Sequence, residues 1–133
     1  MMENTIQKAL SHPFPGHLIR QRKQAWTDRR TGQTRTLSLD YVETAVIIQR
    51  LNEVFGHAWS FDIRESQRID DNQVLVLGAL NAGGVTKTAF GGAAIGNGEE
   101  NVVNAYKAAV GDAIKLCAKQ LGIGLHLWIK GDG

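Results

Sequence analysis

Residues 59–90 read WSFDIRESQRIDDNQVLVLGALNAGGVTKTAF, in which three largely apolar runs are separated by clusters of turn residues. Its first part alternates apolar and polar side chains, with Trp59, Phe61 and Ile63 on one side, which predicts a strand with a buried and a solvated face. The middle run is more continuously apolar, as is typical of a central strand. Clusters of Asp, Asn and Gly form turns between the runs. The stretch therefore predicts a three-stranded antiparallel meander over residues 59–64, 73–80 and 85–90.

An amphipathic helix is expected directly before the meander, over residues 40–55. Asp40 is followed three residues later by Glu43, which is an Asp-led version of the capping box that opens helices. Arg50 and Glu53 fall on one side of this helix. The opposite side is apolar at a spacing of 3.6 residues, and comprises Tyr41, Ala45, Ile47, Ile48, Leu51, Val54 and Phe55.

Two further elements are expected nearer the N-terminus. Residues 3–10 predict a short helix, which the prolines that follow would end. Thr, Arg and Leu alternate around a turn at residues 31–33. This pattern predicts a β-hairpin with arms over residues 17–26 and 34–39.

The last third of the chain predicts a hinge, a long helix and a strand. Glycine-rich residues 91–98 are expected to be a flexible hinge. The helix covers residues 99–121, with acidic residues in its first turn and Lys119 in its last, as the helix dipole favours. Cys117 lies on its apolar stripe and is expected in the core rather than as a nucleophile. Residues 123–129 alternate apolar with other side chains, which predicts a final strand. The full apolar stripe of the helix is Val102, Tyr106, Ala109, Val110, Ala113, Leu116 and Cys117.

This order of elements predicts an α+β domain, in which helices pack on an antiparallel sheet formed by the hairpin and the meander. At 133 residues the chain fits one compact domain. We expect that domain over residues 1–130, with residues 131–133 as the start of a linker or a truncated tail. No apolar run is long enough to cross a bilayer, and the N-terminus lacks the pattern of a secretory signal. A cytoplasmic protein is therefore expected.

The charge of the chain is segregated, although its net charge is only +2. Residues 1–37 carry +5, residues 38–100 carry −5 and residues 101–133 carry +2. A basic N-terminal segment suits a chain that presents a local basic surface to a polyanion. On charge alone, an ordinary solvated surface explains these values equally well.

Residue sets that would carry catalysis or hold a metal are not evident in the sequence. The four histidines are scattered, and none lies at ligand spacing from another or beside a cysteine pair. Asp70 and Asp71 are adjacent in a turn, where solvent exposure explains them better than metal binding. Residues 91–98 lack both the Gly-Lys-Ser/Thr ending of a phosphate loop and the dinucleotide glycine spacing. We therefore expect no cofactor, no metal and no enzymatic activity.

Two groups of residues match motifs of a known family in order and spacing. The first comprises Ile6-Gln7-Lys8-Ala9-Leu10, then Tyr41-x-Glu43, then Leu51-Asn52-Glu53-Val54-Phe55-Gly56 and Trp59. The second comprises residues 108–115, which read AAVGDAIK, followed by Leu121-Gly122. Together they resemble the single-strand annealing proteins of the RAD-fifty-two superfamily, especially its DdrA branch. The resemblance covers about residues 6–125, which is nearly the whole chain.

The resemblance implies a DNA-repair protein with a β-β-β-α core that forms a ring oligomer and holds single-stranded DNA in a basic groove. It implies single-stranded DNA, further copies of the chain and other repair proteins as partners, and a location at the nucleoid. Arg22 falls on a hairpin arginine that contacts DNA in the family, and Lys115 on a groove lysine. Lys119 stands where the family has an arginine, and Tyr41 matches a tyrosine near the groove. With neighbouring cations included, the predicted DNA-binding set is Arg20, Arg22, Lys23, Tyr41, Lys107, Lys115 and Lys119.

The residues themselves allow two interpretations of these positions. Arg22 and its basic neighbours lie close to Trp26 in the sequence. They either form a platform that binds phosphates and stacks on bases, or they are a polar hairpin edge that prevents aggregation. Lys115 and Lys119 are four residues apart, and they either meet phosphates or form a solvated face with Asp112. Tyrosine and tryptophan at positions such as Tyr41 and Trp26 are more often core residues than base-stacking ones. Small side chains beside the two lysines would let a DNA backbone approach, namely Ala105, Ala108, Gly111 and Ala118.

The chain departs from the family at two places, which weakens the expectation of tight binding, of a second outer DNA site and of strong duplex annealing. Residues 97–100 are Asn-Gly-Glu-Glu where the family is rich in lysine, and Leu116 replaces a basic residue. Two other functions stay open. One is a small enzyme with a cleft beside residues 91–98, and the other is a structural oligomer whose basic hairpin docks an acidic partner protein.

Overall fold

The computed structural model describes residues 4–98 and 100–129. Two helices were expected to begin at Glu3 and Glu99, and both residues lie outside the described ranges. The tail 130–133 also lies outside them. The helices are α1 (Asn4–Ser11), α2 (Thr44–Phe55) and α3 (Glu100–Lys119), with short 3-10 helices η1 (Gly16–Leu18) and η2 (Leu125–Leu127). The strands are β1 (Arg20–Thr27), β2 (Thr34–Tyr41), β3 (Trp59–Ile69), β4 (Gln73–Ala82) and β5 (Val85–Ala94).

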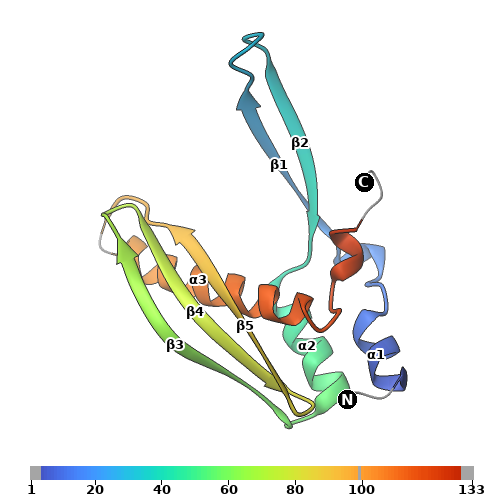
Figure 1. The fold of residues 1–133 in the computed structure, drawn as a ribbon. Helices are drawn as coiled ribbons and strands as arrows, with labels where there is room; N and C mark the ends of the chain where they lie inside the picture. The colour runs from blue at the N-terminus through green and yellow to red at the C-terminus, as the bar shows by residue number, and fades with distance from the viewer. Residues whose placement is uncertain (1–3, 99, 130–133) are drawn as a thin grey trace.

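The expected three-stranded meander and the long helix are confirmed. Strands β3, β4 and β5 form one antiparallel sheet in that order, and α3 crosses one face of it (Figure 1). Val74 and Val76 of β4 are buried there against small residues of α3. Ile63 was expected on the buried face of β3, but its side chain is 53% exposed. The pairing register of β3 shifts at this residue. The small residues of α3 against the sheet are Ala105, Ala109 and Ala113.

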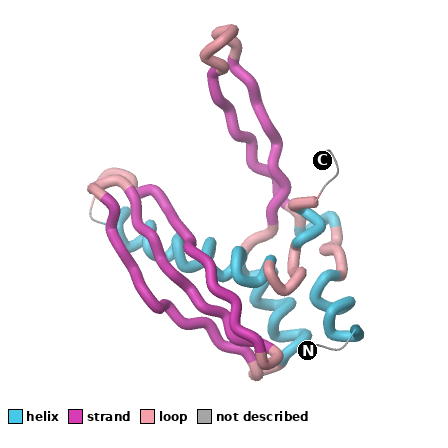
Figure 2. The backbone as a smooth tube through the Cα atoms, viewed as in Figure 1, coloured by secondary structure: helices cyan, strands magenta, loops and turns pink. Residues whose placement is uncertain are grey.

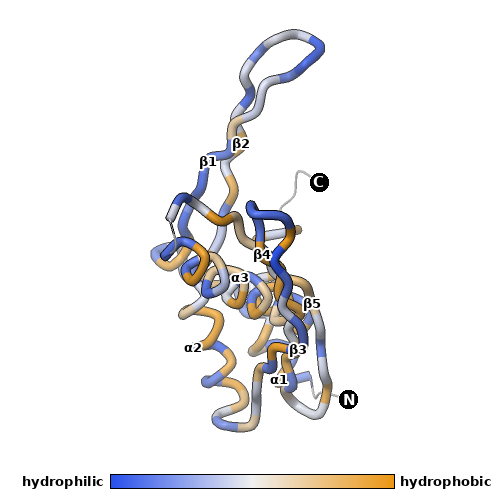
Figure 3. Tube along the Cα trace, turned by 90° about the vertical axis from the view of Figure 1, so that its left-hand side faces the viewer, coloured by the Kyte–Doolittle hydropathy of each residue, from blue (hydrophilic) through white to orange (hydrophobic). Residues whose placement is uncertain are grey.

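The hairpin is also confirmed, but it forms a sheet of its own. β1 pairs with β2 in antiparallel register, and no strand of the meander is hydrogen-bonded to either within the described ranges. The two arms project away from the helices and the larger sheet (Figures 1 and 2). Their connecting loop is hydrophilic, whereas α2 is largely hydrophobic (Figure 3). The single sheet expected from the sequence is therefore two separate sheets.

Gly91 allows β5 to lie directly against α3. A Cβ atom at this position would collide with the carbonyl oxygen of Ala109 and the amide nitrogen of Ala113, and would lie 2.8 Å from the Cα of Ala113. The amide of Gly92 donates to Oδ2 of Asp112 at 3.0 Å, which ties the same strand to the helix. The expectation of a hinge over residues 91–98 is wrong for its first half, because residues 91–94 belong to β5. The glycine serves close packing there rather than flexibility.

A second core cluster joins both ends of the chain to α2, α3 and one end of the sheet. Leu10 and Phe14 from the N-terminal segment are buried with Leu121 and Ile123 from the C-terminal segment. Cys117 is fully buried in this cluster, as expected, and its Sγ lies 3.7 Å from the carbonyl oxygen of Gly78. Burial raises the pKa of the Cys117 thiol, and a backbone hydrogen bond with Leu80 opposes this only in part.

The body of α2 is confirmed, but the predicted capping box is wrong. The helix begins at Thr44 after Glu43, and Glu43 makes no side-chain capping hydrogen bond. Asp40 and Tyr41 instead end β2, where Asp40 pairs with Gln21 and accepts a hydrogen bond from Gln21 Nε2 at 3.1 Å. Long-range pairing in the hairpin therefore takes the two residues that the local pattern assigned to the helix.

Arg50 is buried, although the helical pattern placed it opposite the apolar side of α2. Its Nη1 donates hydrogen bonds to the carbonyl oxygens of Ala9, Leu10 and His12, at 3.1, 2.9 and 2.9 Å. The last carbonyls of a helix lack partners within it, so this guanidinium satisfies the end of α1. It also lies 4.3 Å from the ring centroid of Phe14. Burial lowers the pKa of Arg50, and the Glu53 carboxylate opposes that shift.

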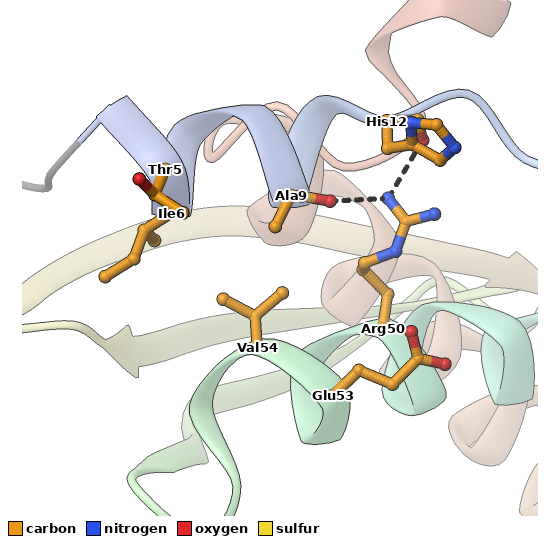
Figure 4. A pocket seen from close by; sticks show the side chains of 7 residues that line it. All are labelled: Thr5, Ile6, Ala9, His12, Arg50, Glu53 and Val54. Atoms are coloured by element: carbon orange, nitrogen blue, oxygen red, sulfur yellow. Dashed lines mark hydrogen bonds between the residues drawn. The ribbon is translucent and has the colours of Figure 1, made fainter.

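Arg50 borders a hollow between α1 and α2 (Figure 4). In Figure 4, Arg50 reaches from α2 toward the carbonyl of Ala9, and Glu53 lies beneath it. The hollow measures about 490 Å³ and is lined mainly by apolar atoms. It lies at the junction of the two helices, and Arg50 is the group that fastens them together there.

The strand expected over residues 123–129 is wrong. The chain turns after α3 and forms η2, with Gly122 at φ 102° and Gly124 at φ 73°. Those left-handed conformations break a strand and favour glycine. Nε2 of His126 accepts a hydrogen bond from the amide of Phe14 at 3.4 Å. Burial lowers the pKa of His126, and the nearby Arg50 charge lowers it further.

Candidate nucleic-acid interface

The pairing register divides the hairpin residues between two faces. Residues that pair directly across two strands share a face, and neighbours along a strand alternate. Arg20 pairs with Tyr41, and Arg22 with Leu39. Lys23 follows Arg22 directly, pairs with Ser38 and therefore lies on the opposite face. We name the first side the groove face, and its residues are Arg20, Arg22, Gln24, Trp26, Arg35, Leu37, Leu39 and Tyr41.

A hollow, here named the hairpin groove, runs between the groove face and the turn that carries η2. Its outer part measures about 290 Å³ and has Arg22 and Leu39 on the hairpin side, with Leu127 and Trp128 opposite. A smaller part beneath it reaches Lys115. Both parts are bordered by Asp40, Tyr41, Leu127 and Trp128. Figure 1 shows the C-terminal turn beside the base of the hairpin. The groove thus combines residues that are about 90 positions apart in the sequence.

The two lysines near the end of α3 each meet an aromatic ring. Nζ of Lys115 lies 5.3 Å from the ring centroid of Tyr41, and Nζ of Lys119 lies 3.8 Å from that of Trp128. Such cation–π contacts are worth about 0.5–1 kcal/mol at exposed sites. Four helical residues rise about 6 Å, so the two pairs are about one turn apart.

Lys115 is held in a site that disfavours its charge. Burial lowers its pKa, and the positive charge of Arg22 lowers it further, while the carboxylates of Asp112 and Glu43 raise it. An anion bound near both cations would offset their mutual repulsion. Asp40 also lines both parts of the groove, so the charge of the groove is mixed.

The other predicted cations line neither part of the groove. Lys119 is one of them, although its Nζ contacts the ring of Trp128, which borders both parts. Arg20 makes an exposed ion pair, with Nε 3.3 Å from Oε1 of Glu43. Lys23 projects from the other face of the hairpin. Lys107 is exposed on α3, eight residues before Lys115, and it lines neither part of the groove.

The expectation that small residues open α3 to a DNA backbone is wrong for three of the four, since only Ala108 among them is exposed. Ala105 and Ala118 are buried in the two cores. A Cβ atom at Gly111 would lie 2.9 Å from Oγ1 of Thr44, so this glycine admits α2 rather than a ligand. Asp112 bonds to the Gly92 amide, and its charge also raises the pKa of Lys115. Ala105, Gly111 and Ala118 therefore serve packing within the domain.

Trp128 is the groove residue that sequence reasoning missed. It was assigned only an alternating place in the strand expected at the C-terminus, and no local signal distinguishes it from a core tryptophan. Trp26, for which a core position was one of the two interpretations, is 48% exposed on the groove face. Both indoles therefore belong to the surface that carries Arg22.

The stretch beside which an enzyme cleft was considered is partly a strand. Within residues 4–98 and 100–129, no group of three or more His, Cys, Asp or Glu side chains is placed to hold a metal ion. Half of the glycine-rich stretch proposed as a cleft is strand β5, packed on α3. None of the helices in the described part of the chain is both long and apolar enough to span a membrane.

Comparison with known proteins adds independent information. A model of the Rad52/22 family of double-strand break repair proteins matches residues 2–130. The chain is 36% identical over 129 residues to the single-stranded DNA-binding protein DdrA of Deinococcus radiodurans, covering 96% of this chain and 57% of that protein. It is 32% identical over 130 residues to the protein of the same name from Deinococcus deserti, covering 96% of this chain and 59% of that protein. The chain thus spans somewhat more than half the length of these curated relatives. No solved structure gives a significant match.

Proposed function

Because this chain belongs to the Rad52/22 family of double-strand break repair proteins, we propose that it binds single-stranded DNA in the hairpin groove without catalysing a reaction. Two relatives that match almost its whole length are named single-stranded DNA-binding proteins. The observation that carries the proposal is the groove itself, in which Arg22 lines the outer part, Lys115 lines the inner part, and Tyr41 and Trp128 border both. Proteins bind single strands with cations that contact the phosphates and with aromatic rings that stack on the bases.

We expect Arg22→Ala, Lys115→Ala and Lys119→Ala each to weaken binding of single-stranded DNA while the fold is retained. Each removed phosphate contact should flatten the slope of log affinity against log salt by roughly 0.7 on single strands. The measurement is a gel-shift or fluorescence-anisotropy titration with single- and double-stranded DNA over a salt series. The loss should be similar for different DNA sequences, because phosphates carry no sequence information.

The matched control is Arg64→Ala, which removes an exposed arginine of β3 that lines neither part of the groove. This variant should keep the affinity and salt slope of the unmodified protein. The groove assignment fails if a Lys115→Ala/Lys119→Ala double variant binds with unchanged affinity and slope. Arg20, Lys23 and Lys107, tested in the same way, should have smaller effects. Within the described part of the chain they line neither part of the groove and, unlike Lys119, none of them lies over an aromatic ring that borders it.

We further propose that copies of the chain assemble into a ring through the sheet of β3, β4 and β5. Phe90 pairs with Leu77 on the face away from α3 and is 57% exposed, although it is a large aromatic residue. β3 and β5 each have one edge that pairs with no strand in the described part of the chain. A neighbouring copy could cover this face and continue an edge, as proteins with exposed sheet edges require.

Sedimentation velocity at micromolar concentration tests the ring. We expect the unmodified protein to sediment as a large oligomer and Phe90→Glu to sediment as smaller species. Val103→Glu adds the same charge at an apolar residue of α3 that is 55% exposed, and it should leave the oligomer intact. A stable monomer at this concentration would count against the ring, and would leave DNA binding by the groove to be judged separately.

In a ring, such a groove could shield single-stranded ends and bring complementary strands together. We propose protection and annealing as the two uses of binding, alone or with other repair proteins. Nuclease digestion of a bound single strand tests protection, and the rate of duplex formation from complementary strands tests annealing. Both effects should fall in parallel with affinity in the Lys115→Ala/Lys119→Ala variant.

A further inference from the structure

The side chain of Trp128 is largely exposed to solvent, although burial of so large an apolar surface would be favourable. It is a large aromatic side chain and is 65% exposed. A tryptophan in the interior would bury most of its 150–250 Å² of surface, so leaving it in water gives up a substantial hydrophobic gain. The next residue, Ile129, is 68% exposed, so the two side chains leave apolar surface together in water. Contiguous exposed apolar surface is typical of sites that bind a partner.

The backbone that carries Trp128 is well anchored. Its amide donates to the carbonyl of Leu125 at 2.9 Å, and that of Leu127 donates to the carbonyl of Gly124 at 3.0 Å. Ile123, five residues earlier, is buried in the core. The indole is therefore held on an ordered turn, and little conformational entropy would be lost when a ligand stacks on it.

The surroundings of the indole suit one nucleotide unit. Nζ of Lys119 lies 3.8 Å from its ring centroid, and Arg22 lines the same part of the groove. An aromatic face with flanking cations matches a base with its flanking phosphates. Tyr41 borders the groove beside Trp128 and offers a second ring nearby.

We propose that the indole of Trp128 stacks on an unpaired base and thereby makes the groove selective for single-stranded over double-stranded DNA. This inference rests on the proposed function, and it assigns the source of strand selectivity to one side chain. In a duplex, both faces of each base are covered by the neighbouring base pairs, so the indole finds no free face. In a single strand a base can leave its neighbours and stack on the ring, while Lys119 turns from the indole to a phosphate.

The test compares Trp128→Ala, Trp128→Leu and Trp128→Phe with the unmodified protein, using oligo(dT) and a duplex of the same length. We expect Ala and Leu to lower single-strand affinity by roughly 5- to 100-fold, the range for loss of one stacked base. Phe should retain most of the affinity because it keeps an aromatic face. Duplex affinity and the salt slope should be unchanged in all three, since no phosphate contact is removed.

A spectroscopic measurement makes the test direct. In a Trp26→Phe/Trp59→Phe background, the remaining indole emission comes from Trp128 and should be quenched by oligo(dT) but not by the duplex. If Trp128→Ala fails to fold, the comparison of Leu with Phe decides the question. Equal affinities for Leu and Phe, equal losses on single and double strands, or absence of quenching would each overturn the inference. Failure of the unmodified protein to bind single-stranded DNA would instead refute the proposed function itself.

Discussion

The Gly91→Ala variant should lose about 3 kcal/mol or more of its free energy of unfolding, because the new methyl group would enter the backbone of α3. The added Cβ would collide with Ala109 and Ala113 at main-chain atoms, which cannot rotate aside as a side chain does. The strand and the helix would have to separate along the contact that buries Val74 and Val76. Urea or thermal unfolding followed by circular dichroism measures the loss, which corresponds to about 10 °C in Tm for a domain of this size.

The control for Gly91→Ala is the same change one residue later. The nearest atom to a Cβ at Gly92 is the carbonyl oxygen of Val74, at 3.5 Å, which is ordinary contact. The amide that bonds to Asp112 is kept in Gly92→Ala. This variant should unfold within about 0.5 kcal/mol of the unmodified protein, as surface substitutions usually do. Equal stabilities of the two variants would show that β5 does not lie this close to α3.

The Arg50→Ala variant should lose about 3 kcal/mol, because three carbonyl oxygens would lose their donor inside the protein. Ala9, Leu10 and His12 all accept from the same Nη1, and an unpaired buried acceptor costs about 1–3 kcal/mol. The packing of the guanidinium on Phe14 is removed as well. Arg50→Lys should recover only part of the loss, since an ammonium group cannot reproduce the planar contact with the ring.

Chemical denaturation measures the overall loss for Arg50→Ala, and limited proteolysis locates it. Cleavage should increase around residues 12–19, where α1 is joined to the hairpin, before it increases in the three-stranded sheet. Arg64→Ala removes an exposed arginine of β3 and should change neither measurement. An unchanged denaturation midpoint for Arg50→Ala would mean that water replaces the guanidinium at the end of α1.

The elements that the sequence predicted well are those with local signals. The meander follows from apolar alternation between turn residues, and the body of α2 and of α3 from a spacing of 3.6 residues. The errors have long-range causes. Asp40 and Glu43 have the spacing of a capping box, but Asp40 is recruited by Gln21 across the hairpin. Arg50 looks like a solvated charge on a helix until the unpaired carbonyls of α1 are placed beside it.

The candidate site was predicted in part, for the same reason. Arg22, Tyr41 and Lys115 border the groove, as the family resemblance implied. Adjacent residues of a strand point to opposite faces, so Arg22 and Lys23 could have been separated from the sequence alone. Trp128 could not have been placed there, because its position depends on the glycine turns after α3 and on how the hairpin stands above them.

The two walls of the hairpin groove come from opposite ends of the chain, and this fixes when the groove comes into being during synthesis. A nascent chain leaves the ribosome N-terminus first, so the hairpin with Arg22 is complete while Lys115 and Trp128 have not yet been made. The core that positions the second wall also waits, since Leu10 and Phe14 pack against Leu121 and Ile123. A chain that is still being translated therefore carries basic residues but no assembled groove. The groove forms only after residues 115–128 have been made and have packed beside the hairpin.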